Sequence, residues 1–447
     1  MKNIIGIRKE DMNPWERRVP LIPSHIRELI KNHGLEFRIQ RSKNRCFADE
    51  DFRLEGARLG NSLKPCSVIL GVKEIPPSSF ERGKTYLFFS HTIKGQARNM
   101  PMLGRMADLR CTLIDYEKIV DGKGRRLVFF GRQAGAAGMI DTLWALGKRL
   151  DVEGRDNPFS GLRQTGKYQS LVEAKEDIAE VGSRIRRFGL PRALTPLVCG
   201  ITGYGHVSQG AQEIFDLLPA EDIEPGGFAA LFKTKKFSPY RVYKTIFREE
   251  NLVRPRSARQ RFDLEEYYAH PERYEAVLET YLPWLTVLVN GVYWAPQYPH
   301  FVTKRFIQTL YSRKSPPRLK VIGDISCDVE GGVECTLVST TPKDPAFVYD
   351  PVRDAAVPGF KGRGPVILAV YNFPAEIPLE SSVFFSQALK PFIPAIAKAD
   401  FDGDFSACRL PRAVKKAVIL YRGEFPSRYK YMRDFLKPMG AGEGGHR

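Results

Sequence analysis

Residues 195–215 read TPLVCGITGYGHVSQGAQEIF, and this stretch decides the predicted fold. The apolar run 197–201 predicts a strand, GYG at 203–205 a tight turn, and 207–217 a helix. Glycines let a backbone approach a pyrophosphate closely, and the amides at a helix N-terminus attract its negative charge. The stretch therefore predicts a dinucleotide site, with an ordinary glycine-rich turn as the alternative.

The match to the dinucleotide pattern G-x-G-x-x-G is incomplete. Ser208 stands where the third glycine is expected, and the next glycine is Gly210, so close packing of this helix must be achieved differently. Glu224 ends a short predicted strand, 222–224, about twenty residues after the turn. An acid at that position would accept a hydrogen bond from a ribose 2′-hydroxyl, which indicates NAD.

Apolar runs alternate with amphipathic stretches through residues 1–120. This alternation is typical of a parallel α/β sheet. It predicts strands at 3–7, 36–39, 68–72, 85–89 and 112–116, and helices at 23–32, 48–59 and 94–107. Further along, helices are predicted at 131–149, 170–188 and 381–397, strands at 286–290 and 320–325, and a disordered tail at 440–447.

These elements predict an α/β fold of two doubly wound, Rossmann-like domains with a cleft between them. We expect a discontinuous substrate domain built from residues 1–135 and 376–447, and a dinucleotide-binding domain from 136–375. Closure of the cleft over bound substrates would exclude water from the reacting groups.

The composition of the 447 residues, 27% charged and 43% hydrophobic, excludes disordered and fibrous classes. No apolar run approaches the roughly 20 residues that cross a bilayer, and the start lacks a secretory signal, so we expect a cytoplasmic protein without a membrane partner. The seven cysteines form no C-x-x-C pair, and the seven histidines have no zinc-ligand spacing. Reduced thiols and no metal are therefore predicted.

The net charge of +18 favours anionic ligands, among them nucleic acid, phosphorylated cofactors and dicarboxylic acids. The densest basic stretch is 233–261, which reads either as a solvated face or as a set of phosphate contacts. It also supports a rival hypothesis, a nucleic-acid-binding protein with a vestigial nucleotide fold. The sequence contains no nucleic-acid module signature, so no nucleic-acid partner is expected.

Ionisable side chains follow several predicted strands, which is where open α/β folds bind ligands. Each alone has a structural explanation, such as a surface lysine, a core histidine or a helix cap. The ionisable candidates are Arg18, Lys73, Glu74, His91, Glu117, Asp324 and Asp328, and the amide of Asn372 is a further candidate in a proline-bearing loop.

Together these segments resemble the superfamily of alanine dehydrogenases, transhydrogenases and lysine-forming saccharopine dehydrogenases. Within it, the likeness is greatest to the lysine-ketoglutarate reductase half of the bifunctional aminoadipic semialdehyde synthases. The resemblance covers almost the whole chain. The motifs that carry it are WERRVPLIP, ILGVKE, FFSHTIKGQ, LIDYEKIVDGKGRR, FGRQAGAAGMID, GYGHVSQGAQEIF, HPERY, NGVYW, DISCDVEGGVECT and SRYKYMR.

The resemblance implies a reductive condensation, in which the ε-amine of lysine attacks the ketone of 2-oxoglutarate and the resulting imine is reduced to saccharopine. It places Lys73 near the imine and His91 at the carbinolamine and amine steps, as proton-transfer residues. Glu74 and Glu117 match acidic residues that tune them, and Asp328 matches a later acidic residue near the nicotinamide.

The same resemblance assigns Arg18 to a substrate carboxylate, which a guanidinium can bind in a bidentate manner. Arg18 and burial would both lower the pKa of Lys73. The resemblance also implies that the cofactor contacts Gly203, Tyr204, Gly205, His206, Val207 and Glu224. The cofactor is NADPH or NADH. Glu224 favours NAD, whereas the resemblance and the basic residues after Glu224 favour NADP, and we choose NADP.

The partners that the resemblance implies are small molecules, namely lysine, 2-oxoglutarate and saccharopine. The glutamate-forming half of the bifunctional proteins has no counterpart in this sequence, so a separate enzyme of that kind, or a second copy of the chain, would be its protein partner. An alternative keeps the fold but joins another amine and oxoacid, as in an alanine dehydrogenase or an opine-forming enzyme. The strings FSHTIK and HPERY favour lysine.

Overall fold

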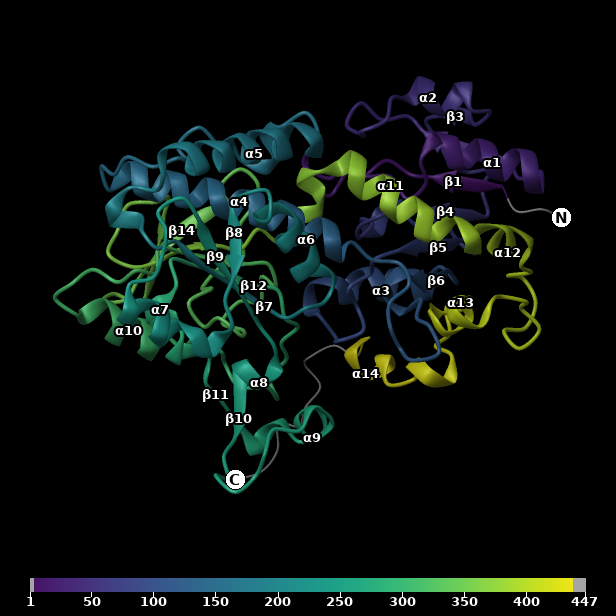
Figure 1. The fold of residues 1–447 in the computed structure, drawn as a ribbon. Coiled ribbons are helices and arrows are strands. Elements are labelled where there is room, and N and C mark those ends of the chain that lie inside the picture. The colour runs from purple at the N-terminus through teal and green to yellow at the C-terminus, as the bar shows by residue number, and fades with distance from the viewer. Residues whose placement is uncertain (1–3, 437–447) are drawn as a thin grey trace. The chain divides into compact units, whose positions relative to one another are not determined.

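The computed structural model describes residues 4–436, and the chain folds into two compact units (Figure 1). The first unit consists of Met1–Phe130 and Pro378–Arg447, and the second consists of Gly131–Ile377. The tail 440–447, for which disorder was predicted, lies outside the described residues.

The first unit contains a seven-stranded sheet of order β17-β6-β5-β4-β1-β2-β3. All neighbouring strands are parallel except β17 and β6. The chain runs outward from β1 to one edge and then returns to β4, so the topological switch point lies between β1 and β4. The strands are β1 (Ile5–Ile7), β2 (Phe37–Gln40), β3 (Arg58–Gly60), β4 (Val68–Leu70), β5 (Thr85–Phe88), β6 (Thr112–Asp115) and β17 (Val418–Leu420).

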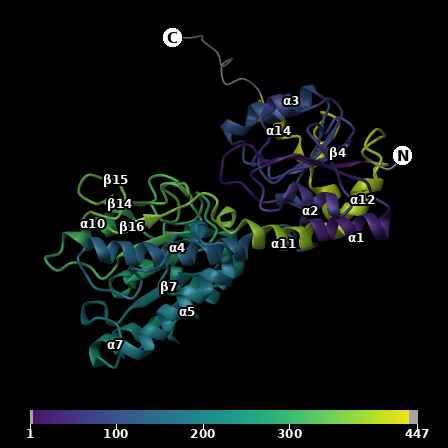
Figure 2. The same ribbon diagram turned by 90° about the horizontal axis from the view of Figure 1, so that it is seen from above.

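Helices cover both faces of this sheet, with α1 and α12 on one side of β4 and α3 and α14 on the other (Figure 2). The C-terminal segment is tied to the N-terminal one, because the backbone N–H of Ile22 donates to Ser386 Oγ of α11 at 3.0 Å. The helices are α1 (Pro23–His33), α2 (Asp49–Leu54), α3 (Met100–Asp108), α11 (Pro378–Leu389), α12 (Ile393–Lys398), α13 (Arg412–Lys416) and α14 (Met432–Leu436).

The second unit contains an eight-stranded sheet of order β15-β14-β16-β13-β12-β7-β9-β8. The strands from β16 to β8 are parallel, and β14 and β15 form an antiparallel edge. Its switch point lies between β7 and β12. The strands are β7 (Val198–Thr202), β8 (Ala220–Asp222), β9 (Val242–Phe247), β12 (Val287–Asn290), β13 (Val321–Asp324), β14 (Ala346–Asp350), β15 (Ala355–Pro358) and β16 (Val366–Leu368).

Separate hydrophobic cores lie on the two faces of this second sheet. Figure 1 shows α4 (Gly131–Val152), α5 (Leu171–Phe188) and α6 (His206–Phe215) over one face, and α7 (Phe228–Thr234) and α10 (Lys304–Ser312) on the opposite side. A small antiparallel ribbon, β10 (Val253–Pro255) with β11 (Tyr274–Ala276), extends from the sheet with α8 (Glu249–Leu252) and α9 (Leu264–Ala269).

The glycines of α4 and α6 lie where these two helices meet. A Cβ at Gly210 would lie 2.0 Å from the carbonyl oxygen of Arg132, and one at Gly135 would lie 1.8 Å from that of Val207. The two helices therefore cross in backbone contact, and Gly210 serves this crossing rather than contact with β7.

The predicted α/β, doubly wound fold class is confirmed by the two sheets and their crossovers. The helix predicted at 48–59 is wrong in its second half, because α2 ends at Leu54 and β3 begins at Arg58. Gly56, with φ of 92°, reverses the chain between them. Among the described residues, no helix is long and apolar enough to span a membrane.

Candidate active site

Glu10 joins the two strands at the switch point of the first sheet. It follows β1, and its carboxylate accepts hydrogen bonds from the backbone N–H groups of Val72, at 2.8 Å, and Lys73, at 3.1 Å, which follow β4. The Glu10 side chain is 4% exposed and lies 3.8 Å from Arg8. The chain segment that carries Lys73 is therefore anchored by a buried carboxyl group.

Burial changes the proton affinity of both Glu10 and Lys73. It raises the pKa of Glu10 from 4.5 to about 7, against the opposing charge of Arg8. It also lowers the pKa of Lys73, where the charge of Glu74 opposes the shift and that of Arg18 adds to it. The direction of this shift is the one expected of a lysine that acts as a general base.

Glu74 connects Lys73 to His91. Its Oε1 lies 2.7 Å from Nδ1 of His91 and 3.5 Å from a guanidinium nitrogen of Arg98. Burial opposes the negative charge of Glu74, but the hydrogen bond and charge of His91 and the charge of Lys73 together lower its pKa to about 2. Glu74 is therefore ionised at neutral pH and fixes the orientation of the imidazole.

The backbone also holds His91 in a defined place. Its φ of 46° lies in the left-handed region, which a non-glycine residue adopts only where the surroundings impose it. Asn99 donates from its side-chain amide to the His91 carbonyl at 3.0 Å, and the ring of Phe89 stacks on the imidazole. Lys73, Glu74 and His91, all predicted from the sequence, thus lie in one cluster.

Arg18 and Glu16 form a buried, bidentate ion pair. Nε of Arg18 donates to Oε1 of Glu16 at 2.8 Å, and Nη2 donates to Oε2 at 2.6 Å, with both side chains at most 1% exposed. The guanidinium also lies 4.2 Å from the ring centre of Phe130. A substrate carboxylate could bind this edge of the guanidinium in a bidentate manner only by displacing Glu16.

Glu117 contacts neither Lys73 nor His91 through any of the described hydrogen bonds. It follows β6, its backbone N–H donates to Asp115 Oδ1 at 2.7 Å, and its carboxylate pairs with Arg126. The buried Asp115, by contrast, accepts a hydrogen bond from the Ser90 N–H at 3.1 Å, directly before His91, and burial raises its pKa. Asp115 is thus linked to His91 through the backbone.

The second unit presents the predicted glycine turn at the carboxyl end of β7. Gly203 has φ of 79°, which favours glycine, and its N–H donates to the Phe247 carbonyl at 2.8 Å. Gly205 precedes α6, and a Cβ built there meets no atom within 4 Å. The space in front of the N-terminus of α6, beside His206 and Val207, is therefore open to a phosphate group.

A cavity of about 490 Å³ continues from this turn and is lined by Tyr204 and Glu224 among others. Glu224 follows β8, but β9 lies between β8 and β7 in the sheet, and β9 ends at Phe247 and is followed by Arg248. Arg248 also lines the cavity, and its guanidinium lies 5.4 Å from the ring centre of Tyr204. Sequence spacing pointed to Glu224 and missed Arg248.

Asp324 belongs to a buried network that ties three strand ends together. Thr202 Oγ1 donates to Asn290 Oδ1 at 2.8 Å, and the Asn290 amide donates to Asp324 Oδ1 at 2.9 Å. Burial raises the pKa of Asp324, although Thr336 donates to its second oxygen at 2.6 Å. Asp324 is structural by these contacts, whereas Asp328 is half-buried in the following loop.

The basic stretch 233–261 does not form one continuous face. It passes through α7, β9, α8 and β10, and several of its cations are paired with carboxylates. Lys244 lies 2.5 Å from Asp216, and Arg254 lies 2.7 Å from Glu275. Within residues 4–436, no group of three or more His, Cys, Asp or Glu side chains is placed to hold a metal ion, and the seven cysteines are free.

Comparison with known proteins agrees with this fold. Residues 6–137 match the family described as alanine dehydrogenase/PNT, N-terminal domain. A solved L-alanine dehydrogenase has the same fold, with a TM-score of 0.62 at 17% identity, and the match covers 97% of this chain and 99% of that one.

Two relatives with named activities resemble the chain over most of its length. The chain is 37% identical to the alpha-aminoadipic semialdehyde synthase of Arabidopsis thaliana over 96% of its own length, and it spans 41% of that protein. It is 27% identical to the saccharopine dehydrogenase [NAD(+), L-lysine-forming] of Emericella nidulans, covering 87% of this chain and 91% of the relative. The resemblance predicted from the sequence is confirmed.

Proposed function

We propose that the chain is a lysine-ketoglutarate reductase, an oxidoreductase of lysine degradation that condenses L-lysine with 2-oxoglutarate and reduces the imine to saccharopine. The observation that carries the proposal is the cluster of Lys73, Glu74 and His91 at the carboxyl ends of β4 and β5, beside the switch point. Open α/β sheets bind ligands at this place, and the cluster supplies two proton-transfer groups.

The roles follow from the charges in the cluster. A lysine with a lowered pKa can take a proton from the attacking substrate amine and return one to the imine nitrogen. His91, held by the ionised Glu74 at 2.7 Å, can protonate the carbinolamine hydroxyl so that it leaves as water. A bound reduced nicotinamide would supply the hydride. Arg18 would hold a substrate carboxylate, and Asp328 would lie near the nicotinamide.

The residues around the glycine turn fit a dinucleotide. The left-handed Gly203, the open space at Gly205 and the cavity of about 490 Å³ could hold a pyrophosphate and an adenosine. Contacts from Tyr204, His206, Val207 and Glu224 belong to this proposal. The cleft expected between the domains, and the closure over substrates, stay predictions.

Arg248 supports NADPH as the cofactor. In the cavity, Lys244 is already neutralised by Asp216 and by Asp222, at 2.5 and 3.3 Å, whereas no carboxylate among the described residues lies within ion-pair distance of Arg248. A guanidinium there could bind a 2′-phosphate, which Glu224 would repel.

The cofactor preference can be tested with one substitution. Arg248→Gln is expected to lower the ratio of kcat/KM for NADPH to that for NADH by about tenfold or more. Arg254→Gln, which removes an exposed arginine paired with Glu275, serves as the matched control and should leave the ratio unchanged. An unchanged ratio in Arg248→Gln would remove the basis for choosing NADPH.

The reaction itself is tested with a matrix of amines against oxoacids. Reduced cofactor should be consumed with lysine and 2-oxoglutarate together, and not with either alone. Consumption with ammonia and pyruvate, or with another amine and oxoacid, would replace the proposal by the alanine dehydrogenase or opine-forming alternative. A cytoplasmic location, a second copy of the chain and a separate glutamate-forming enzyme stay predictions.

A further inference from the structure

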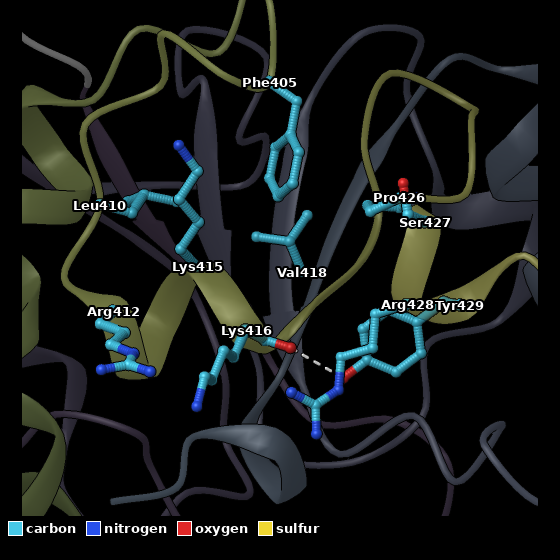
Figure 3. A pocket seen from close by; sticks show the side chains of 10 residues that line it. All are labelled: Phe405, Leu410, Arg412, Lys415, Lys416, Val418, Pro426, Ser427, Arg428 and Tyr429. Atoms are coloured by element: carbon cyan, nitrogen blue, oxygen red, sulfur yellow. Dashed lines mark hydrogen bonds between the residues drawn. The ribbon is translucent and has the colours of Figure 1, made fainter. Parts of the chain in front are cut away.

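A cavity of about 520 Å³ lies in the first unit beside the edge strand β17 (Figure 3). We call it the β17 pocket, and its walls come from α13, β17 and the segment Pro426–Tyr429. It is separate from the candidate active site, because β6 and β5 lie between β17 and β4 in the sheet order, and none of the candidate catalytic residues lines it. Its volume is that of a small-molecule site.

The pocket has an apolar part and a cationic part. Phe405, Leu410 and Val418 form apolar wall, and Val418 is completely buried. Figure 3 shows Arg412, Lys416 and Arg428 spread along the opposite side. No acidic residue lines the pocket, so its electrostatic potential is positive.

Two polar groups of the pocket are already used by the protein. Lys415 donates from Nζ to the carbonyls of Ser406, at 2.9 Å, and Cys408, at 3.0 Å. The Tyr429 hydroxyl donates to the Lys416 carbonyl at 2.8 Å, drawn as a dashed line in Figure 3. These contacts fix the walls and leave the three cations of Arg412, Lys416 and Arg428 for a ligand.

Those three cations have no carboxylate within ion-pair distance among residues 4–436. Two guanidinium groups and one ammonium group are suited to phosphate oxygens, because arginine donates in a planar fork and lysine acts as a point charge. One carboxylate would neutralise only one of them. The charge therefore fits a multiply charged phosphate, and the apolar wall fits an attached aromatic or aliphatic body.

We propose that the β17 pocket binds an organic phosphate, a small molecule that joins a multiply charged phosphate group to an aromatic or aliphatic body. The phosphates would lie against Arg412, Lys416 and Arg428, and the body against Phe405 and Leu410, which are only half-buried. This site is additional to the dinucleotide cavity of the second unit, and it does not depend on which reaction the protein catalyses.

The test is calorimetric titration of the full chain with three probes: ATP, pyrophosphate as the charged part alone, and adenosine as the body alone. No dinucleotide is added, because NADPH is itself an organic phosphate and would compete for the β17 pocket; the substitutions below assign the ATP bound there. ATP is expected to bind at least tenfold more tightly than either fragment. Equal affinities for ATP and pyrophosphate would overturn the proposal, because the apolar wall would then contribute nothing, and so would the absence of ATP binding.

Substitutions locate the binding. Arg412→Gln with Arg428→Gln removes two exposed cations of the pocket and should weaken ATP at least tenfold. Arg58→Gln with Arg105→Gln removes the same charge from exposed positions elsewhere in the first unit and should change the affinity less than twofold. Circular dichroism checks that both double variants fold. Equal losses in the two, or no loss in the pocket variant, would contradict the assignment.

Discussion

Lys73 is the residue on which the proposed chemistry depends most. We expect Lys73→Met to reduce kcat by about 10²-fold or more, because general acid–base groups contribute on that scale. Dinucleotide affinity should not change, since the glycine turn belongs to the second unit. Cofactor oxidation and nicotinamide fluorescence measure the two quantities.

Lys64→Met is the matched control for this experiment, because Lys64 is an exposed lysine of the same unit. It should retain full turnover. If Lys73→Met kept most of its kcat, or lost cofactor affinity to the same degree as turnover, Lys73 would not be the proton-transfer group.

Glu10 makes the stability of the protein depend on pH. Its pKa is about 7 in the folded chain against the ordinary 4.5, so the folded state binds the proton more tightly. The stabilisation is complete below the ordinary pKa of 4.5 and is lost as pH rises through the folded pKa of about 7. The total loss is roughly 3 kcal/mol at most. Wild type should therefore lose stability between pH 5 and about pH 7.5.

Glu10→Gln isolates this effect. The variant has no titrating group at this position. The unfolding free energy of wild type minus that of the variant should therefore fall as pH increases. Denaturant unfolding at several pH values measures it. A difference that stays constant or grows with pH would show that Glu10 is ionised in the folded protein at all of these pH values.

Sequence patterns identified some residues of the two candidate sites and missed others for a physical reason. Lys73, Glu74 and His91 stood out because they follow recognisable strands within family motifs. Glu10 lies in the charged segment IRKED, which reads as a solvated turn, and only the pairing of β1 with β4 buries it. Arg248 was missed because spacing along the chain does not specify which strand lies beside β7.

At the level of elements, the strand, glycine turn and helix at β7 and α6 could be predicted, because each has a local signature. The order of β8 and β9 could not, since it results from packing of the whole sheet. The same holds for Gly210, whose role became visible only when α4 was seen to cross α6.

The close crossing of α4 and α6 predicts that an added methyl group at Gly210 lowers the unfolding free energy. In Gly210→Ala, the new Cβ would lie 2.0 Å from the Arg132 carbonyl, so the helices must separate. We expect a loss of about 1–3 kcal/mol in unfolding free energy. Gly226→Ala, where a Cβ meets no atom within 4 Å, should change stability by less than about 0.5 kcal/mol. Similar losses in both variants would contradict the packing account.

For the whole molecule, whose net charge is +18, the structure places the basic side chains in two kinds of surroundings. Part of the basic stretch 233–261 is neutralised by carboxylates, as at Lys244 and Arg254. Other cations collect around cavities, Arg248 in the second unit and Arg412, Lys416 and Arg428 in the first. This distribution favours small anionic ligands over a nucleic-acid surface.

The most direct test of the proposed reaction follows the hydride itself. The full chain is incubated with lysine, 2-oxoglutarate and reduced cofactor carrying deuterium at the transferable position, and the products are analysed by mass spectrometry. We predict saccharopine that contains one deuterium, formed only when both substrates are present. Absence of saccharopine, or saccharopine without the label, would contradict the assignment.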